Sequence, residues 1–223
     1  MSISHSSNRR RLIAGASLVG LSVTFLAHTV AGLTNESGAL SQTTNALVGF
    51  EAVLNSLLMT GALLGLAQLL RARADWAGLL GAAFALVGWA VATRISALIQ
   101  IDALLRAGVE GVPPAALESA FKSAPIVWTS VFPVGLFFPL GLITLGVALC
   151  WRSPLNRWCG LPLALGGLLF PVGRAAGHEF AVISCDLLLA AAFAAFGWGI
   201  LTRPEAWGTT PGGSETLKSS VAG

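Results

Sequence analysis

The stretch GWAVATRISALIQID, residues 88–102, lies inside a nearly unbroken apolar run from Trp76 to Leu105. A bilayer core about 30 Å thick is crossed by roughly 20 apolar residues in a helix, because each residue rises about 1.5 Å. The run is long enough for such a crossing. It therefore predicts a transmembrane helix, and Arg94 inside it is a charge that another helix must neutralise.

The composition of the whole chain also indicates that lipid, and not water, surrounds the protein. The chain has 223 residues, of which 55% are hydrophobic and only 10% are charged, and its mean hydropathy is +0.78. A soluble domain carries roughly 25% charged residues, so this chain has too few to cover a surface in water. The apolar stretches are long and do not alternate in polarity, which excludes barrel strands. We predict an all-α integral membrane protein, a bundle of about six transmembrane helices.

The six predicted spans leave only short segments at the two ends of the chain. They cover residues 12–33, 46–70, 76–105, 126–151, 158–175 and 180–201. Together they form a transmembrane domain over 12–201, between a short cytoplasmic N-terminus (1–11) and a disordered cytoplasmic tail (202–223). The long connection after the third span separates two groups of three helices, which is the layout of 3+3 inverted halves. Six helices without internal symmetry are the alternative.

The tetrapeptide Phe-Pro-Val-Gly occurs twice, at 132–135 and 170–173. A proline inside a helix removes one backbone donor and frees the carbonyl four residues earlier. We therefore expect helix breaks at Pro133 and Pro171, both in the outer half of the membrane.

The distribution of Lys and Arg predicts the orientation. Most of them lie in the loops on the side of the N-terminus, and cytoplasmic loops are the ones enriched in these residues. Both termini are therefore expected in the cytoplasm, with the protein integral to the cell (inner) membrane. The pI of about 9.1 is read as this topology signal. We expect no nucleic-acid partner, because no basic cluster is dense enough to follow a phosphate backbone.

Four of the predicted spans each carry one ionisable residue about 8 to 16 Å below the outer surface. Asn55 follows Glu51 at a spacing of four, so both share one helix face. The half of the membrane near the N-terminus is predicted to be almost free of polar residues. The predicted ligand- or proton-binding residues are His28, Glu51, Asn55, Arg94, Gln100 and Asp186.

Arg94 is expected to pair with Glu51 or Asp186, because a charge at the bilayer centre costs roughly 2.5 to 3.5 kcal/mol on insertion scales. A dry structural ion pair and a water-filled binding pocket both remain open for this group of residues. The segment GRAAGHEF, residues 173–180, lies at the rim of the site as a solvated turn. Its predicted rim residues are Arg174, His178 and Glu179.

These residues favour a membrane protein that binds or transports a small solute or proton through an outward-facing polar pocket. One alternative is a regulatory or scaffold protein that sequesters a protein partner. The other is an intramembrane enzyme acting on a lipid or quinone, although no catalytic residue is assigned and the reading leans away from an enzyme. No histidine or cysteine spacing fits a zinc or haem site, and no cofactor is assigned.

The expected partners are the lipid bilayer, a small-molecule ligand, and either a second copy of the chain or another membrane or cytoplasmic protein. Pairs of small residues such as Gly61 and Gly65 would permit close contacts between helices.

Overall fold

A computed structural model describes residues 3–34, 42–71, 76–107, 132–174 and 178–208. Within these ranges, the side chains of 3–6, 31–34, 42–53, 92–107, 132–133, 206 and 208 lie outside the description. The described part of the chain is all-helical and contains no strand, which confirms the predicted fold class at that level.

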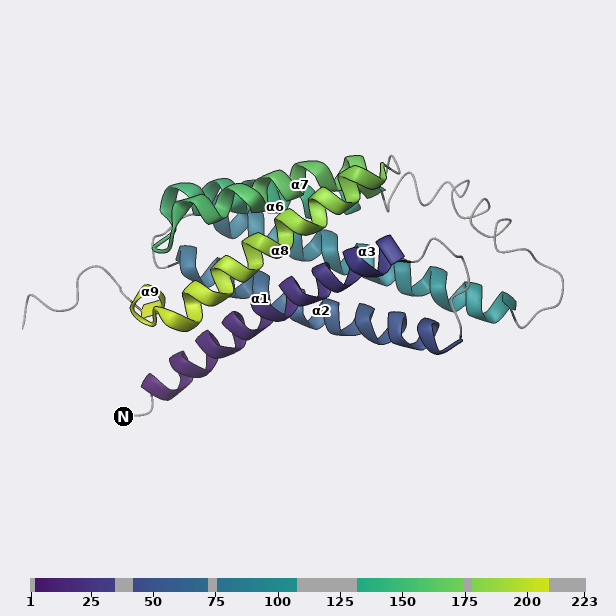
Figure 1. Ribbon diagram of the computed structural model, residues 1–223. Helices are drawn as coiled ribbons and strands as arrows, with labels where there is room; N and C mark the ends of the chain where they lie inside the picture. Colours follow the sequence, from purple (N-terminus) through teal and green to yellow (C-terminus); the bar gives the residue numbers. More distant parts are fainter. Residues whose placement is uncertain (1–2, 35–41, 72–75, 108–131, 175–177, 209–223) are drawn as a thin grey trace, which may run out of the picture.

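Long helices make up most of the described structure (Figure 1). They are α1 (Ile3–Thr34), α2 (Gln42–Arg71), α3 (Trp76–Ala107), α6 (Phe137–Arg152), α7 (Gly160–Arg174) and α8 (Glu179–Thr202). The short ones are α5 (Phe132–Gly135), the 3-10 helix η2 (Arg157–Cys159) and α9 (Glu205–Gly208). Most bounds differ from the predicted spans by a few residues, α1 begins earlier than predicted, at Ile3, and α9 forms within the segment predicted as a tail.

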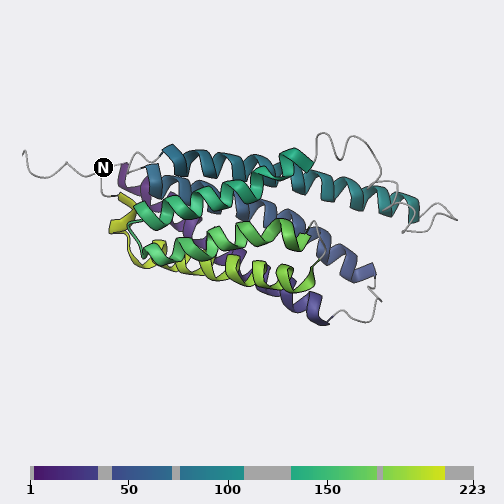
Figure 2. The same cartoon turned by 90° about the horizontal axis from the view of Figure 1, so that it is seen from above.

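The long helices form an elongated bundle in which each packs on the next one along the chain (Figures 1 and 2). α8 packs in turn on α1, so the order of neighbours closes into a ring. Among the described residues, three helical segments are long and apolar enough to cross a membrane, namely Ser7–Val30, Leu54–Arg71 and Glu179–Thr202.

Apolar side chains occupy both the interior and the exterior of the bundle. Phe138, Phe193 and Phe196 are fully buried in one core cluster together with leucines from several of the long helices. Many other large apolar side chains, such as Leu57 and Leu168, are more than half exposed. A soluble protein rarely exposes apolar patches of this extent. The exterior is therefore the kind of surface that lipid covers.

Glycines allow the helix backbones to approach closely. A Cβ added at Gly81 of α3 would lie 2.7 Å from the backbone nitrogen of Leu145 in α6. A Cβ added at Gly197 of α8 would lie 3.0 Å from the carbonyl oxygen of Gly15 in α1. Small residues at such positions let helices pack without a side chain between them, as they do in membrane bundles.

The two proline motifs behave differently. A turn at Leu136, between Pro133 and Pro139, separates α5 from α6 within the predicted helix over 126–151. The carbonyl that Pro133 would free is that of residue 129, and residues 126–131 lie outside the description, so the break expected at Pro133 stays a prediction. The expected break at Pro171 is wrong, because Pro171 lies inside the continuous helix α7. α7 packs against both α6 and α8, and neighbouring helices let a membrane helix tolerate proline.

Candidate functional site

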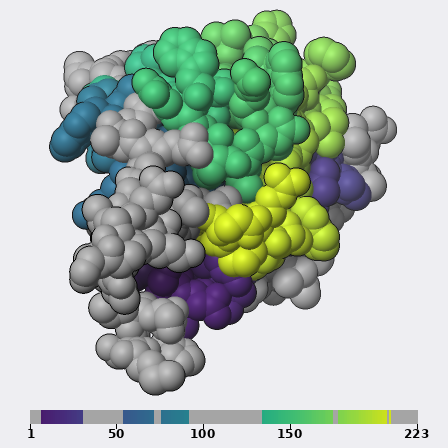
Figure 3. All heavy atoms as spheres, turned by 90° about the vertical axis from the view of Figure 1, so that its left-hand side faces the viewer, coloured from purple at the N-terminus to yellow at the C-terminus, as the bar shows by residue number. Residues whose placement is uncertain are grey.

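The two ends of the bundle differ in charge. We call the end with the N-terminus and α9 the basic end; Figure 3 views the molecule from this side. Its described arginines are Arg9, Arg10, Arg11, Arg71, Arg152, Arg157 and Arg203. At the opposite end, α7 finishes and α8 begins. The candidate site lies at this opposite end, where three helices bring charged and titratable side chains together.

Asp186 of α8 is the buried charge of the site, with a side chain only 1% exposed. Nη2 of Arg174, at the end of α7, donates to both carboxylate oxygens of Asp186, at 3.0 and 3.1 Å. The Arg174 side chain is 37% exposed, so the ion pair runs from the interior toward the surface. A buried carboxylate is tolerated when a cation compensates it in this way.

The length of α7 explains this pairing. The helix has 15 residues, which rise about 22 Å and leave it short of a full bilayer crossing. Gly173 packs tightly on α8, since a Cβ there would lie 2.8 Å from the backbone nitrogen of Val182. Asp186 follows Val182 by one helical turn. The long Arg174 side chain therefore reaches from the end of α7 to a carboxylate one turn deeper on α8.

His28 of α1 is the third member of the cluster. Its Nε2 lies 3.2 Å from Nη1 of Arg174. A guanidinium only donates hydrogen bonds, so Nε2 accepts this one in the tautomer that carries its proton on Nδ1. Arg174 thus joins a buried carboxylate and an imidazole through two different nitrogens.

Asn55 is placed beside the cluster by a different contact. The Thr24 hydroxyl of α1 lies 3.4 Å from Oδ1 of Asn55 in α2 and donates at 2.9 Å to the carbonyl of Leu21. Thr24 and His28 are one turn apart on α1. The polar face of α1 therefore contacts α2 through Thr24 and α7 through His28.

The predicted site residues have different outcomes. The structure brings His28 and Asp186 together through Arg174 and places Asn55 on the neighbouring helix pair. The side chains of Glu51, Arg94 and Gln100 lie outside the described residues.

The predicted pairing of Arg94 with Glu51 therefore stays a prediction. For Asp186, the partner that the structure describes is Arg174.

Of the three predicted rim residues, the structure places one in the cluster and two outside it. His178 caps the start of α8 without a side-chain hydrogen bond, and Glu179 follows as the first residue of that helix; both are exposed. Arg174, in contrast, is the cation of the cluster. Sequence reasoning missed this role because it treated residues 173–180 as one solvated turn. The available signal was the shortness of the fifth predicted span, which corresponds to the 15-residue helix α7 that ends at Arg174.

The cluster contains one histidine and one carboxylate beside an arginine, which suits proton exchange and anion recognition. Among the residues that the structure describes, no three His, Cys, Asp or Glu side chains gather in a way that would hold a metal ion.

The fold and the cluster define an all-helical protein with membrane-length apolar helices and a buried ion pair linked to a histidine. Comparison with family models, with curated proteins and with solved structures gave no match that would narrow this class further.

Proposed function

We propose that the protein is a six-helix membrane protein that binds a proton, and with it a small anionic solute, at the His28–Arg174–Asp186 cluster. The observation that carries the proposal is the shared arginine: Arg174 contacts a buried carboxylate and a histidine at the same time. Intramembrane histidines and carboxylates are the groups that proton-dependent membrane proteins use.

Protonation of His28 changes this arrangement. The imidazolium has no lone pair to offer, so it cannot accept from Arg174. The imidazolium is instead attracted to the Asp186 carboxylate, and it competes with Arg174 for that carboxylate. Arg174 is thereby released toward the surface, where its guanidinium matches a carboxylate or phosphate group. Proton binding and anion binding then favour each other.

The membrane arrangement is part of the proposal. Three apolar segments have the length of a span, and α3, the α5–α6 pair and α7 lie beside them in the ring of neighbours. We infer that all six cross or enter the membrane as two groups of three. The arginines of the basic end favour a cytoplasmic position for that end and for both termini. The His28–Arg174–Asp186 cluster then opens to the outside.

The proposal concerns binding at one end, since the described interior beneath the cluster is mostly apolar, with the Ser17 and Ser22 hydroxyls of α1 as its buried polar groups. Phe25 and Phe193 contact each other there with ring centroids 5.9 Å apart. Leu189, one turn below Asp186 on α8, is fully buried. In this conformation the described residues therefore offer the bound solute no polar path toward the basic end.

The test measures thermal stability in nanodiscs with acetate and phosphate as anion probes. At about pH 5.5 and pH 7.5, which flank the ordinary titration of imidazole, we expect either anion to raise the Tm of the parent protein more at the lower pH. His28→Gln should remove this pH dependence, because glutamine accepts a hydrogen bond but binds no proton. Arg174→Gln should remove the response to both anions.

His178→Gln is the matched control, since His178 is exposed at the same end and makes no capping hydrogen bond. It should behave like the parent protein. An anion response that His28→Gln leaves fully pH-dependent would refute the proton link. The absence of any response to acetate and phosphate at both pH values would refute an anion site at Arg174.

The enzyme alternative has less support from the same geometry. It needs Asp186 as one half of an acid–base pair whose partners have separated pKa values. Both oxygens of Asp186 accept from Arg174, so neither is free to exchange a proton with a substrate while this ion pair is intact.

A further inference from the structure

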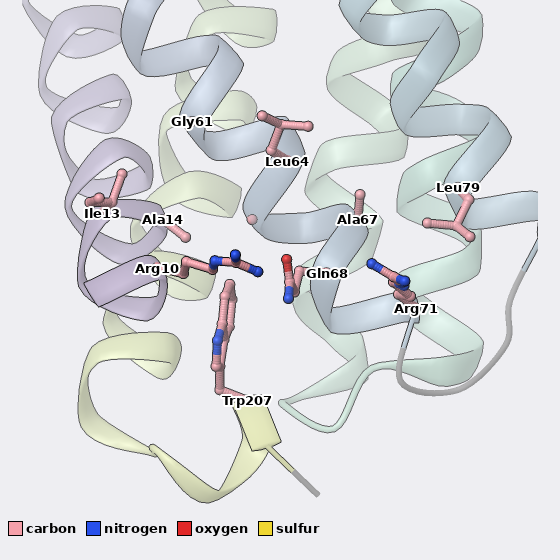
Figure 4. A pocket seen from close by; sticks show the side chains of 11 residues that line it. Arg10, Ile13, Ala14, Gly61, Leu64, Ala67, Gln68, Arg71, Leu79 and Trp207 are labelled. Carbon is pink, nitrogen blue, oxygen red and sulfur yellow. The ribbon is translucent and has the colours of Figure 1, made fainter. Parts of the chain in front are cut away.

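A cavity of about 440 Å³ opens at the basic end, between α1, α2 and the start of α3 (Figure 4). Its volume is within the usual range for sites that bind small molecules. The side chains of Arg10, Gln68 and Trp207 converge at one side of it, from α1, α2 and α9 respectively (Figure 4). Arg71, at the end of α2, lines the same cavity. This site lies at the end of the bundle away from the His28–Arg174–Asp186 cluster.

The positive charge of the cavity is not neutralised by the described part of the chain. Arg10 and Arg71 are both exposed, and no carboxylate among the described residues forms an ion pair with either of them. Two guanidinium groups that line one cavity form a site for a planar or tetrahedral anion, which each can bind through paired hydrogen bonds. The Gln68 amide adds a further polar group beside Arg10 (Figure 4).

The depth of these charges in the membrane follows from the helix bounds. Arg10 lies in the first turn of the apolar segment Ser7–Val30, and Arg71 is the last residue of the segment Leu54–Arg71. Both therefore lie where an apolar helix segment meets the headgroup region of one leaflet. An anion bound between them would be at the level of lipid phosphates.

The remainder of the cavity is apolar and open at its side. Ile13 of α1 and Leu64 of α2 line it and are 63% and 55% exposed. Gly61 and Gly65 lie on the α2 side of the cavity, where α1 packs closely on α2, since a Cβ added at Gly65 would lie 2.5 Å from the Cβ of Ala14. In a membrane, an opening with these walls admits an acyl chain from the surrounding lipid.

We propose that this cavity binds an anionic phospholipid, with its phosphate held by the arginines that line the cavity, Arg10 and Arg71, and one acyl chain against Ile13 and Leu64. Charge complementarity selects the anionic headgroup, and the apolar side opening selects a lipid over a free anion. Trp207 closes the cavity toward the aqueous side, in the interfacial position that tryptophan favours.

Native mass spectrometry of the whole protein tests this inference. The protein is released from micelles that contain phosphatidylglycerol and phosphatidylcholine in equal amounts. The parent should retain phosphatidylglycerol in preference to phosphatidylcholine. Each arginine near a membrane surface contributes roughly fivefold in affinity for an anionic lipid, so we expect a preference on the order of thirtyfold. The Arg10→Gln/Arg71→Gln variant should lose most of it.

The Arg152→Gln/Arg157→Gln variant is the matched control, because these arginines are exposed at the same end and lie outside the cavity lining. It should keep the parent's preference. Equal retention of both lipids by the parent protein, or equal loss of preference in both double variants, would overturn the inference. Inorganic phosphate at millimolar concentration provides a further arm: if it displaces the lipid completely, the cavity is a free-anion site and the lipid assignment is wrong. Circular dichroism shows whether each variant keeps its helical fold.

Discussion

Both ends of the bundle contain arginine side chains, but the two ends differ in whether the chain supplies a counter-charge to them. At the opposite end, Arg174 contacts Asp186 and His28, so the chain supplies the cation, the anion and the titratable group. At the basic end, Arg10 and Arg71 line a cavity without a described carboxylate partner. A charge that the chain neutralises itself can fix helix packing, whereas one left without its counter-charge is available to a ligand.

The difference also concerns depth. Asp186 is buried and needs a compensating cation at all times, while Arg10 and Arg71 are exposed at the ends of apolar segments. Removing a charge at the opposite end should therefore destabilise the fold. Removing one at the basic end should change lipid binding and leave the fold intact.

The largest effect is expected for Arg174→Met. This change leaves the Asp186 carboxylate buried without its cation, and breaking such a pair costs about 3 kcal/mol, the lower end of the usual range because Arg174 is partly exposed. The double variant Arg174→Met/Asp186→Leu removes both charges and should recover most of the lost stability. Thermal unfolding in nanodiscs measures both variants. A double variant as unstable as the single one would show that the ion pair is not the cause.

A smaller loss is expected in the middle of the bundle, where uncharged contacts hold the helices together. Gly81→Ala places a Cβ against the backbone of α6, and overpacking of this kind costs about 1 to 3 kcal/mol. Gly135→Ala is its control, since nothing lies within 4 Å of the added carbon. If the two variants unfold at the same temperature, the close approach of α3 and α6 is not as tight as described.

Thr24→Val should have a modest effect, because it removes the hydroxyl that contacts Asn55 across α1 and α2. Interhelical hydrogen bonds in membranes contribute about 0.6 kcal/mol on average. Thr60→Val is the comparison, since the Thr60 hydroxyl bonds only within its own helix, to the carbonyl of Ser56. The loss for Thr24→Val should exceed that for Thr60→Val in the same unfolding assay. The reverse order would argue against a polar link between α1 and α2.

The smallest effect concerns a thiol at the basic end. Burial raises the pKa of Cys159, which lies in η2, and the neighbouring Cys150 raises it further. Only the thiolate reacts with maleimide, so labelling should be slow at neutral pH and should accelerate as the pH rises above the ordinary thiol range. A Cys150→Ser/Cys185→Ser background leaves Cys159 as the one thiol and tests the effect of burial alone, because it also removes the contribution of Cys150. Labelling as fast at neutral pH as in the unfolded chain would contradict a partly buried thiol.

The fold class followed directly from the apolar run lengths, because a backbone in lipid must satisfy its own hydrogen bonds in helices. The first and last residues of α2 and α8 lie within a few residues of those predicted for the corresponding spans. The continuity of α7 through Pro171 was not predictable, since it depends on packing against two neighbouring helices.

The candidate site was predicted only in part. Depth along each span placed His28 and Asp186 in one group, and in the structure both contact Arg174. The partner of Asp186 was not predicted, because counting residues along single helices cannot show that α7 stops short of the surface. The cavity at the basic end was missed for a similar reason: Arg10 and Gln68 lie on different helices, and only their crossing brings them together.

The most direct test of the central claim is nitrogen-15 NMR of protein labelled at histidine and arginine in nanodiscs, with His5 and His178 replaced by glutamine. The account predicts that neutral His28 carries its proton on Nδ1, because Nε2 accepts from Arg174. Lowering the pH should convert this signal to the imidazolium and shift the Arg174 side-chain resonances over the same pH range. A neutral His28 with its proton on Nε2, or Arg174 resonances that ignore the titration, would contradict a proton-linked cluster.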